Sequence, residues 1–182
     1  MPTENFPSQT VKMLRDSGYE FEEPEIVAKT GWTTDELQSA ISTRHLKSSY
    51  DFVTLLIGVN NQYRGRSIAD YKPEFESLLK QAVHFANGKA NRVIVLSIPD
   101  WGVTPFANDS DRKKVAGDID EYNAANREIA EAYKATYIDI TVGTREAAND
   151  LSLLAADRLH PSAKEYAKWS ERIYHVIRRQ LQ

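Results

Sequence analysis

Two nearly continuous apolar runs constrain the fold of this chain more than any other feature. One covers residues 51–58 and ends in a glycine, and the other covers residues 92–99 and ends in a proline. Each run has the length of a strand, and uninterrupted apolar character is typical of strands buried on both faces of a parallel sheet. A sheet of this kind must be covered by helices, so the two runs predict an α/β fold.

The segments around these runs alternate between helical and strand patterns. Residues 25–29 and 136–140 are short β-rich runs that predict two further strands. Apolar spacing and capping residues predict helices over about 6–17, 33–41, 71–83, 110–133 and 162–181. With right-handed crossovers, this alternation predicts a three-layer α/β/α sandwich around a doubly wound parallel sheet, in one domain that covers residues 1–182.

The composition excludes several classes of function. The net charge of −3 is scattered over 182 residues, so we expect no nucleic-acid partner, which would need a basic stripe. No apolar run approaches the roughly 20 residues of a membrane span, and none is expected. The absence of cysteine excludes disulfides, thiolate catalysis and cysteine-ligated zinc. Oligomeric state is not indicated, and localisation stays open, with the cytoplasm as the default expectation.

In parallel α/β sheets, ligands bind outside the carboxyl ends of the strands. The loops that matter therefore follow Lys29, Ile57, Ile98 and Ile140. The strand pattern alone indicates these loops, without reference to any motif.

The segment Asp157-Arg158-Leu159-His160-Pro161 lies in the last of these regions. A carboxylate three residues before a histidine can accept one ring N–H, which leaves the other ring nitrogen free to act as a general base. The alternative is a histidine that only contributes a contact near the start of a helix, and on these residues alone that alternative is the more frequent one.

Two glycine-containing loops could supply donors for a developing negative charge. Asn60, two residues after Gly58, can donate from its side-chain amide, and the amide of Gly31 lies close to a predicted helix start. Taken singly, each loop is more simply a turn or an ordinary strand–helix connection. Their occurrence with Asp157 and His160 at one end of the sheet favours a common site.

At these residues the chain resembles the SGNH (GDSL-type) serine ester hydrolases. That family carries four blocks in order: Gly-Asp-Ser, a Gly, Gly-x-Asn-Asp and Asp-x-x-His. The last three are matched here by Gly31, by residues 58–61 and by residues 157–160. Residues 58–65 and 97–105 look like one bacterial subgroup of the family. The resemblance implies that Gly31 and Asn60 form an oxyanion hole, and that Asp157 orients His160 as general base and acid.

Two departures from the family pattern stand out. The third block ends in Asn61 instead of aspartate, and no Gly-Asp-Ser occurs anywhere in the sequence. The resemblance places the nucleophilic serine after a first central strand, between the strands predicted at 25–29 and 51–57, and therefore upstream of Met1. Five buried side chains at about 1.5–3 kcal/mol each would carry a stabilisation similar to that of a whole domain. We therefore expect an N-terminally truncated domain that is nearly inactive and poorly stable.

The resemblance implies hydrolysis of a small carboxylic ester, as in esterases, lysophospholipases, thioesterases and carbohydrate acetylesterases, without a metal or cofactor. Trp32, Tyr63 and Trp101 are candidate walls of the substrate pocket from their loop positions, with core packing as the alternative, and residues 100–109 are a candidate mobile flap. A second hypothesis is a catalytically degenerate relative that binds an acyl or sugar ligand. A flavodoxin-like nucleotide binder is a weaker third, because no phosphate-binding loop is recognisable.

Overall fold

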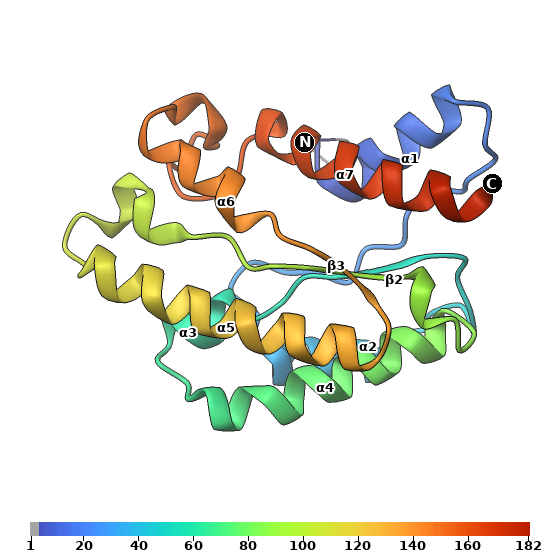
Figure 1. Cartoon of the computed structure of the whole chain (residues 1–182), viewed down its shortest axis with the longest axis horizontal. Helices are drawn as coiled ribbons and strands as arrows, with labels where there is room; N and C mark the ends of the chain where they lie inside the picture. Colours follow the sequence, from blue (N-terminus) through green and yellow to red (C-terminus); the bar gives the residue numbers. More distant parts are fainter. Residues whose placement is uncertain (1–3) are drawn as a thin grey trace. The chain divides into compact units, whose positions relative to one another are not determined.

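The computed structural model describes residues 4–182, which divide into two compact units (Figure 1). The sheet unit comprises residues 27–99 and 116–139. The terminal unit comprises the described residues up to 26 together with 100–115 and 140–182.

The sheet unit is built on three parallel strands in the order β1-β2-β3. They are β1 (Val53–Leu55), β2 (Val93–Leu96) and β3 (Thr136–Ile138). All four residues of β2 are fully buried, as expected of a central strand with a continuous apolar sequence. The prediction of an α/β fold with a parallel sheet is therefore confirmed.

The helices of this unit precede β1 or lie between its strands in the sequence. They are α2 (Thr34–Thr43), α3 (Val59–Tyr63), α4 (Ile68–Phe85), the short 3-10 helix η1 (Ala90–Arg92), and α5 (Arg112–Ala132), whose first residues belong to the terminal unit. Helix α4 packs against β1 and α2, and it buries the apolar residues that recur along one of its faces. Figure 1 shows α4 and α5 on the same side of the strands. The helical spacing of residues 71–83 therefore predicted a helix that packs on the sheet.

The terminal unit contains two long helices that pack on each other, α1 (Phe6–Asp16) and α7 (Ala163–Leu181) (Figure 1). The ring centroid of Phe6 lies 6.2 Å from that of Tyr166 and 5.9 Å from that of Trp169. The Ser170 hydroxyl donates to the Phe6 carbonyl. The remaining elements are short: η2 (Trp101–Val103), η3 (Pro105–Ala107), α6 (Thr141–Thr144), η4 (Arg145–Ala148) and η5 (Leu151–Leu153).

The strand predicted for residues 25–29 is wrong. The structure forms no strand there, and the side chain of Ile26 is 41% exposed. A β-rich sequence becomes a strand only when a neighbouring strand completes its hydrogen bonds. Within residues 4–182, β1 pairs with β2 along one edge and with no strand along the other, and residues 25–29 do not pair with that open edge.

The segment predicted as a flap begins at a buried ion pair in the terminal unit. Asp100 is 2% exposed, and its carboxylate accepts from the Arg145 Nε at 2.8 Å and from the Gly102 amide at 2.9 Å. The backbone amide of Asp100 donates to the Thr144 hydroxyl at 3.2 Å. The first residues of the predicted flap are therefore held against α6 and η4.

Removal of Arg145 should destabilise the protein, because it leaves the Asp100 carboxylate buried without its cation. We expect Arg145→Ala to lower the free energy of unfolding by about 3 kcal/mol, the lower end of the range for a broken buried pair, because Arg145 is partly exposed. The matched control is Lys12→Ala, which breaks the exposed Lys12–Asp16 pair on α1 and should cost less than about 1 kcal/mol. Equal losses for the two variants in urea unfolding would contradict this assignment.

Candidate functional site

Asp157 and His160 lie together on a tight loop between η5 and α7. An antiparallel bridge between Leu154 and Pro161 closes the loop, and the amide of Ala155 donates to the His160 carbonyl at 2.7 Å. Within the loop, the Asp157 carboxylate lies 2.7 Å from the Nδ1 atom of His160. The contact that the family resemblance implies for these two residues is therefore present.

The loop also keeps the Asp157 carboxyl group ionised. Partial burial raises its pKa, but hydrogen bonds from the amides of His160 and Leu159 and from the imidazole outweigh that effect, and the net pKa lies below the usual 3.8. An ionised carboxylate can only accept, so Nδ1 carries a hydrogen and Nε2 is the free ring nitrogen. Among residues 4–182 no hydrogen-bond partner meets Nε2, and the side chain of His160 is 46% exposed.

Gly31 and Asn60 lie together in the sheet unit. Gly31 has a φ of +90° in a turn closed by a hydrogen bond from Trp32 to Lys29, and Asn60 lies in the first turn of α3. The side-chain amide of Asn60 donates to the Trp32 carbonyl at 3.0 Å, which fixes the amide orientation because a carbonyl cannot donate in return. One N–H of Asn60 then remains. In the described part of the chain, the Gly31 amide also has no acceptor.

Two residues outside the set of predicted site residues contact these loops: Arg64, which the sequence did not single out, and Asn61, which it singled out only as a departure from the family motif. The Arg64 guanidinium donates to the Gly31 carbonyl at 2.7 Å. Asn61 is fully buried, and its side chain bonds to Thr34 at the start of α2. The residues Gly58 to Asn61 begin a short helix, so the alternative of a simple turn is replaced by a helix start tied to the neighbouring loop.

Gly58 is required at the end of β1 by a buried tyrosine. A Cβ atom at position 58 would lie 2.9 Å from Cζ of Tyr71 and would overlap its hydroxyl oxygen, and the φ of Gly58 is +123°. The Tyr71 hydroxyl lies 3.0 Å from the Ile57 carbonyl and 2.8 Å from the Asn126 side chain. Burial raises the pKa of Tyr71 well above 10, so its hydroxyl keeps the hydrogen that holds the end of the strand.

Charged groups surround the start of α2. The Arg66 guanidinium, at 2.7 Å, and the Thr33 hydroxyl lower the pKa of Asp35 to about 2. The backbone amide and the hydroxyl of Thr33 also lower the pKa of Glu36 below 4.5. These contacts join the first turn of α2 to the residues that follow α3.

The aromatic candidates are divided between the units. Trp32 is half-buried and Tyr63 is exposed, and both belong to the sheet unit with Gly31 and Asn60. Trp101 is half-buried in the terminal unit, to which Asp157 and His160 belong, and its ring meets that of the exposed Phe106 edge-on at 5.9 Å. The structure thus brings together two groups: Gly31 with Trp32 and Asn60, and Asp157 with His160.

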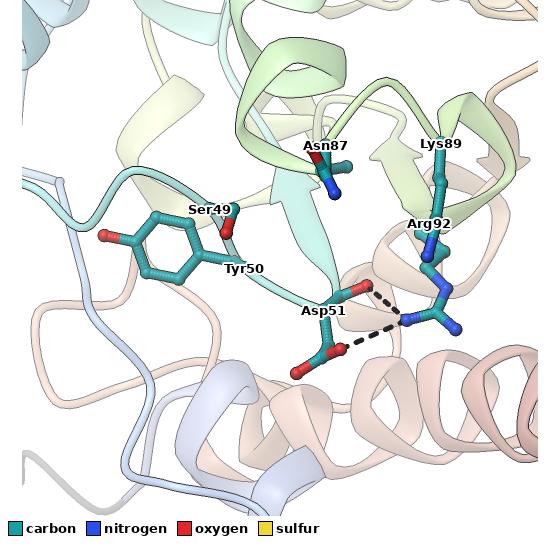
Figure 2. A pocket seen from close by; sticks show the side chains of 7 residues that line it. Ser49, Tyr50, Asp51, Asn87, Lys89 and Arg92 are labelled. Atoms are coloured by element: carbon teal, nitrogen blue, oxygen red, sulfur yellow. Dashed lines mark hydrogen bonds and ion pairs between the residues drawn. The ribbon is translucent and has the colours of Figure 1, made fainter.

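A small polar pocket of about 120 Å³ lies elsewhere in the sheet unit (Figure 2). Its lining includes Asp51, which precedes β1, and Arg92, which precedes β2, and these two form an ion pair at 3.2 Å. The pocket is therefore at the amino ends of the strands, opposite to the edge where parallel sheets bind ligands. None of the candidate site residues lines this pocket.

Two other kinds of site are absent from the described part of the chain. Residues 4–182 contain no cluster of three or more His, Asp or Glu side chains that could hold a metal ion. None of the helices over the same residues combines the length and the apolar character that a membrane span requires.

Substitution of Gly58 should cost more than substitution of a glycine that has only backbone strain. We expect Gly58→Ala to lower the free energy of unfolding by about 3–5 kcal/mol, since strain and overlap with Tyr71 add. Gly65→Ala, at a φ of +68° with open space around it, should cost about 1–2 kcal/mol. Chemical denaturation measures both, and equal losses would show that Tyr71 does not constrain this turn.

The low pKa of Asp35 predicts a pH-dependent contribution to stability. The folded pKa is about 2 and the unfolded pKa about 3.9, so the contribution is complete above about pH 4 and is lost as the pH falls through about 2. Because the pair is partly exposed, we expect Asp35→Asn to cost about 1 kcal/mol at pH 7 and progressively less toward pH 2. Unfolding curves at several pH values test this, and a difference that does not vary with pH would contradict it.

Comparison with solved structures shows several proteins of the same fold. The lipase/acylhydrolase from Enterococcus faecalis is 18% identical with a TM-score of 0.75, over 96% of this chain and 85% of that chain. Two structures of Axe2, an acetylxylan esterase from Geobacillus stearothermophilus, are 19% and 20% identical with TM-scores of 0.70 and 0.68, each over 95% of this chain and 80% of that chain. Both are described as catalytic mutants of Axe2: in one an aspartate is replaced by alanine, and in the other a histidine three positions later.

Comparison at the level of sequence identifies the family. No curated protein sequence gives a significant match to this chain. The sequence model of the GDSL-like lipase/acylhydrolase family, by contrast, matches residues 2–168, which is nearly the whole chain. The solved structures of the same fold include esterases. The chain therefore belongs to the GDSL-like lipase/acylhydrolase family, whose members are ester hydrolases.

Proposed function

We propose that this chain provides the general base, its orienting carboxylate and the oxyanion hole of a serine hydrolase that acts on small carboxylic esters. The observation that carries the proposal is the 2.7 Å contact between Asp157 and Nδ1 of His160, which leaves Nε2 free and accessible. A histidine held in this way can take a proton from a hydroxyl nucleophile and return it to the leaving alcohol.

The spacing of the two residues supports this assignment. Asp157 and His160 are three positions apart, as are the aspartate and the histidine that were replaced in the catalytic mutants of Axe2. Partial exposure of both side chains suits a base that must meet an incoming substrate.

Gly31 and Asn60 are the proposed oxyanion donors. When a hydroxyl attacks the ester carbonyl, the carbonyl oxygen takes up negative charge, and donors placed in advance stabilise that charge more than the neutral ground state. The Gly31 amide and the second N–H of Asn60 suit this role because neither donates to an acceptor within residues 4–182. In addition, the Trp32 carbonyl holds the Asn60 side chain next to the Gly31 loop.

The proposed nucleophile is a serine outside the 182 printed residues, because no Gly-Asp-Ser occurs among them. Its oxygen would form a bond to the acyl carbon while its hydrogen passes to Nε2 of His160 and then to the leaving alcohol; water would release the acid by the same steps. The amino end of α1 supports this placement. The Gln9 side chain donates to the carbonyls of both Glu4 and Ala163, so the segment that leads into α1 passes close to the residues that follow His160.

The strand that carries such a serine would pair with the free edge of β1. Within residues 4–182 this edge has no partner. A strand added parallel to β1 would end at the edge where Gly58 and Asn60 follow β1, since the carboxyl ends of parallel strands lie on the same side. Trp32, Tyr63 and Trp101 are the proposed walls for the acyl and alcohol groups of the ester.

The missing motif also favours a second candidate, a catalytically degenerate relative that binds an acyl or sugar ligand without turning it over. The two functions differ in the sequence that precedes residue 1 in the reading frame. A strand followed by Gly-Asp-Ser there supports the hydrolase, and an in-frame stop codon supports the binding module.

Hydrolysis of p-nitrophenyl acetate tests the proposal. We expect the 182-residue chain to be nearly inactive, and the protein extended by its preceding reading frame to be active. In the extended protein, His160→Ala should lower kcat on the order of 10⁴–10⁶-fold. His175→Ala is the matched control, because His175 also lies near an acidic residue, Glu171, on the exposed surface of α7, and it should leave kcat unchanged.

Two outcomes would contradict the proposal. Turnover by the 182-residue chain that depends on His160 would show a nucleophile inside these residues. An extended protein that carries Gly-Asp-Ser and binds the ester but does not hydrolyse it would favour the binding module.

A further inference from the structure

We propose that Asn61, Thr34 and Glu74 form a directional hydrogen-bond relay that positions the two loops bearing Gly31 and Asn60. Asn61 stands where the family motif usually has aspartate, and Glu74 on α4 is the acceptor that makes the asparagine necessary. The positioning role rests on the proposed function of Gly31 and Asn60, whereas the relay itself rests only on contacts within the sheet unit.

The orientation of the Asn61 amide follows from its partners. Its side-chain oxygen accepts from the backbone amide of Thr34 at 3.1 Å, and its side-chain nitrogen lies 2.7 Å from the Thr34 hydroxyl oxygen. A flipped amide would place an NH₂ group against the Thr34 N–H, which are both donors. The Asn61 nitrogen must therefore donate to the Thr34 hydroxyl.

This orientation decides where the Thr34 hydrogen points. The Thr34 hydroxyl oxygen accepts a hydrogen bond from Asn61. The O–H of Thr34 therefore donates to the Glu74 carboxylate, which it contacts. Glu74 in turn lies 3.6 Å from the Arg66 guanidinium. Hydrogen bonds are thus donated in one direction: Asn61 donates to Thr34, and Thr34 donates to Glu74. The last acceptor is a carboxylate near the Arg66 cation.

An aspartate at position 61 would conflict with this direction. Its carboxylate has no hydrogen to donate, so it would compete with Glu74 for the single hydrogen of Thr34. Position 61 is 0% exposed, and burial of a carboxylate next to a second carboxylate is costly. Positions 61 and 74 should therefore be coupled. Asparagine at position 61 is compatible with glutamate at position 74, whereas aspartate at position 61 requires a residue at position 74 that can donate a hydrogen bond.

The relay joins the two loops of the candidate oxyanion hole. Asn61 directly follows Asn60, and Thr34 lies three residues after Gly31. Two flanking contacts join the same loops: the one from Asn60 to Trp32 is partly buried, and the one from Arg64 to Gly31 is exposed. Loss of the relay should therefore displace both proposed donors at once.

A double-mutant cycle in the 182-residue chain tests the relay. We expect Asn61→Asp to shift the folding equilibrium toward the unfolded state by roughly 10- to 100-fold at pH 7, the effect of an unsatisfied buried group. Addition of Glu74→Gln should recover at least roughly 10-fold of that loss, because the introduced glutamine amide can donate to Thr34, whose hydrogen then goes to the introduced aspartate. Glu76→Gln, on the same helix and with the same exposure as Glu74, is the matched control and should recover nothing.

A second pair of variants covers the case in which Asn61→Asp does not fold. Thr34→Ser keeps the hydroxyl and should retain the stability of the parent within roughly threefold, whereas Thr34→Val removes it and should lose roughly 10-fold or more. A Thr34→Val protein as stable as the parent would overturn the relay. Equal rescue of Asn61→Asp by Glu74→Gln and Glu76→Gln would also overturn it, since that result would reflect net charge alone.

The positioning role has its own readout. In nuclear magnetic resonance spectra, Asn61→Asp should shift the Gly31 amide and the Asn60 side-chain amide, and Glu74→Gln should return both toward their original positions. Unchanged signals in a coupled cycle would overturn the positioning role. If positions 61 and 74 are coupled but the extended protein does not hydrolyse the ester, the relay stands and the proposed function is wrong.

Discussion

Parallel pairing of the three strands is the constraint on which the site in the sheet unit depends. Because β1, β2 and β3 run in the same direction, their carboxyl ends share one edge, and the chain leaves β1 through Gly58 directly into α3. The turn is held by Tyr71, which fills the space that a Cβ atom would need. The position of Asn60 thus follows from the strand direction and one glycine.

The polar contacts at this edge join segments that are far apart in the sequence. Residues 31–36 meet residues 60–66 through a buried pair, Asn61 and Thr34, and through exposed contacts of Arg64 and Arg66. Burial makes the first contact strong and directional, because an unsatisfied polar group there would be costly. The exposed contacts close the same junction but are individually weaker.

Local sequence patterns predicted the features that depend on few partners. The continuous apolar sequence of β2 and the helical spacing of α4 were predictable, because each depends on burial. The contact of Asp157 with His160 was expected from the family resemblance, since spacing alone favoured a simple contact near a helix start. The strand predicted at 25–29 failed because a strand needs a neighbour. The importance of Asn61 and Tyr71 was not predictable, since it depends on contacts with Thr34 and Gly58 across the fold.

An ester hydrolase that works as proposed requires that the imidazole of His160 and the donors at Gly31 and Asn60 act on the same ester carbonyl. The absence of cysteine allows a direct measurement, in which a nitroxide is attached at Ala156→Cys, next to Asp157, or at Lys89→Cys, at the amino ends of the strands. Both positions are exposed. If these groups act on the same carbonyl, the label at 156 should cause strong relaxation enhancement of the Gly31 and Asn60 amide signals, and the label at 89 should cause little. Unaffected Gly31 and Asn60 signals with the label at 156 would contradict the proposed mechanism.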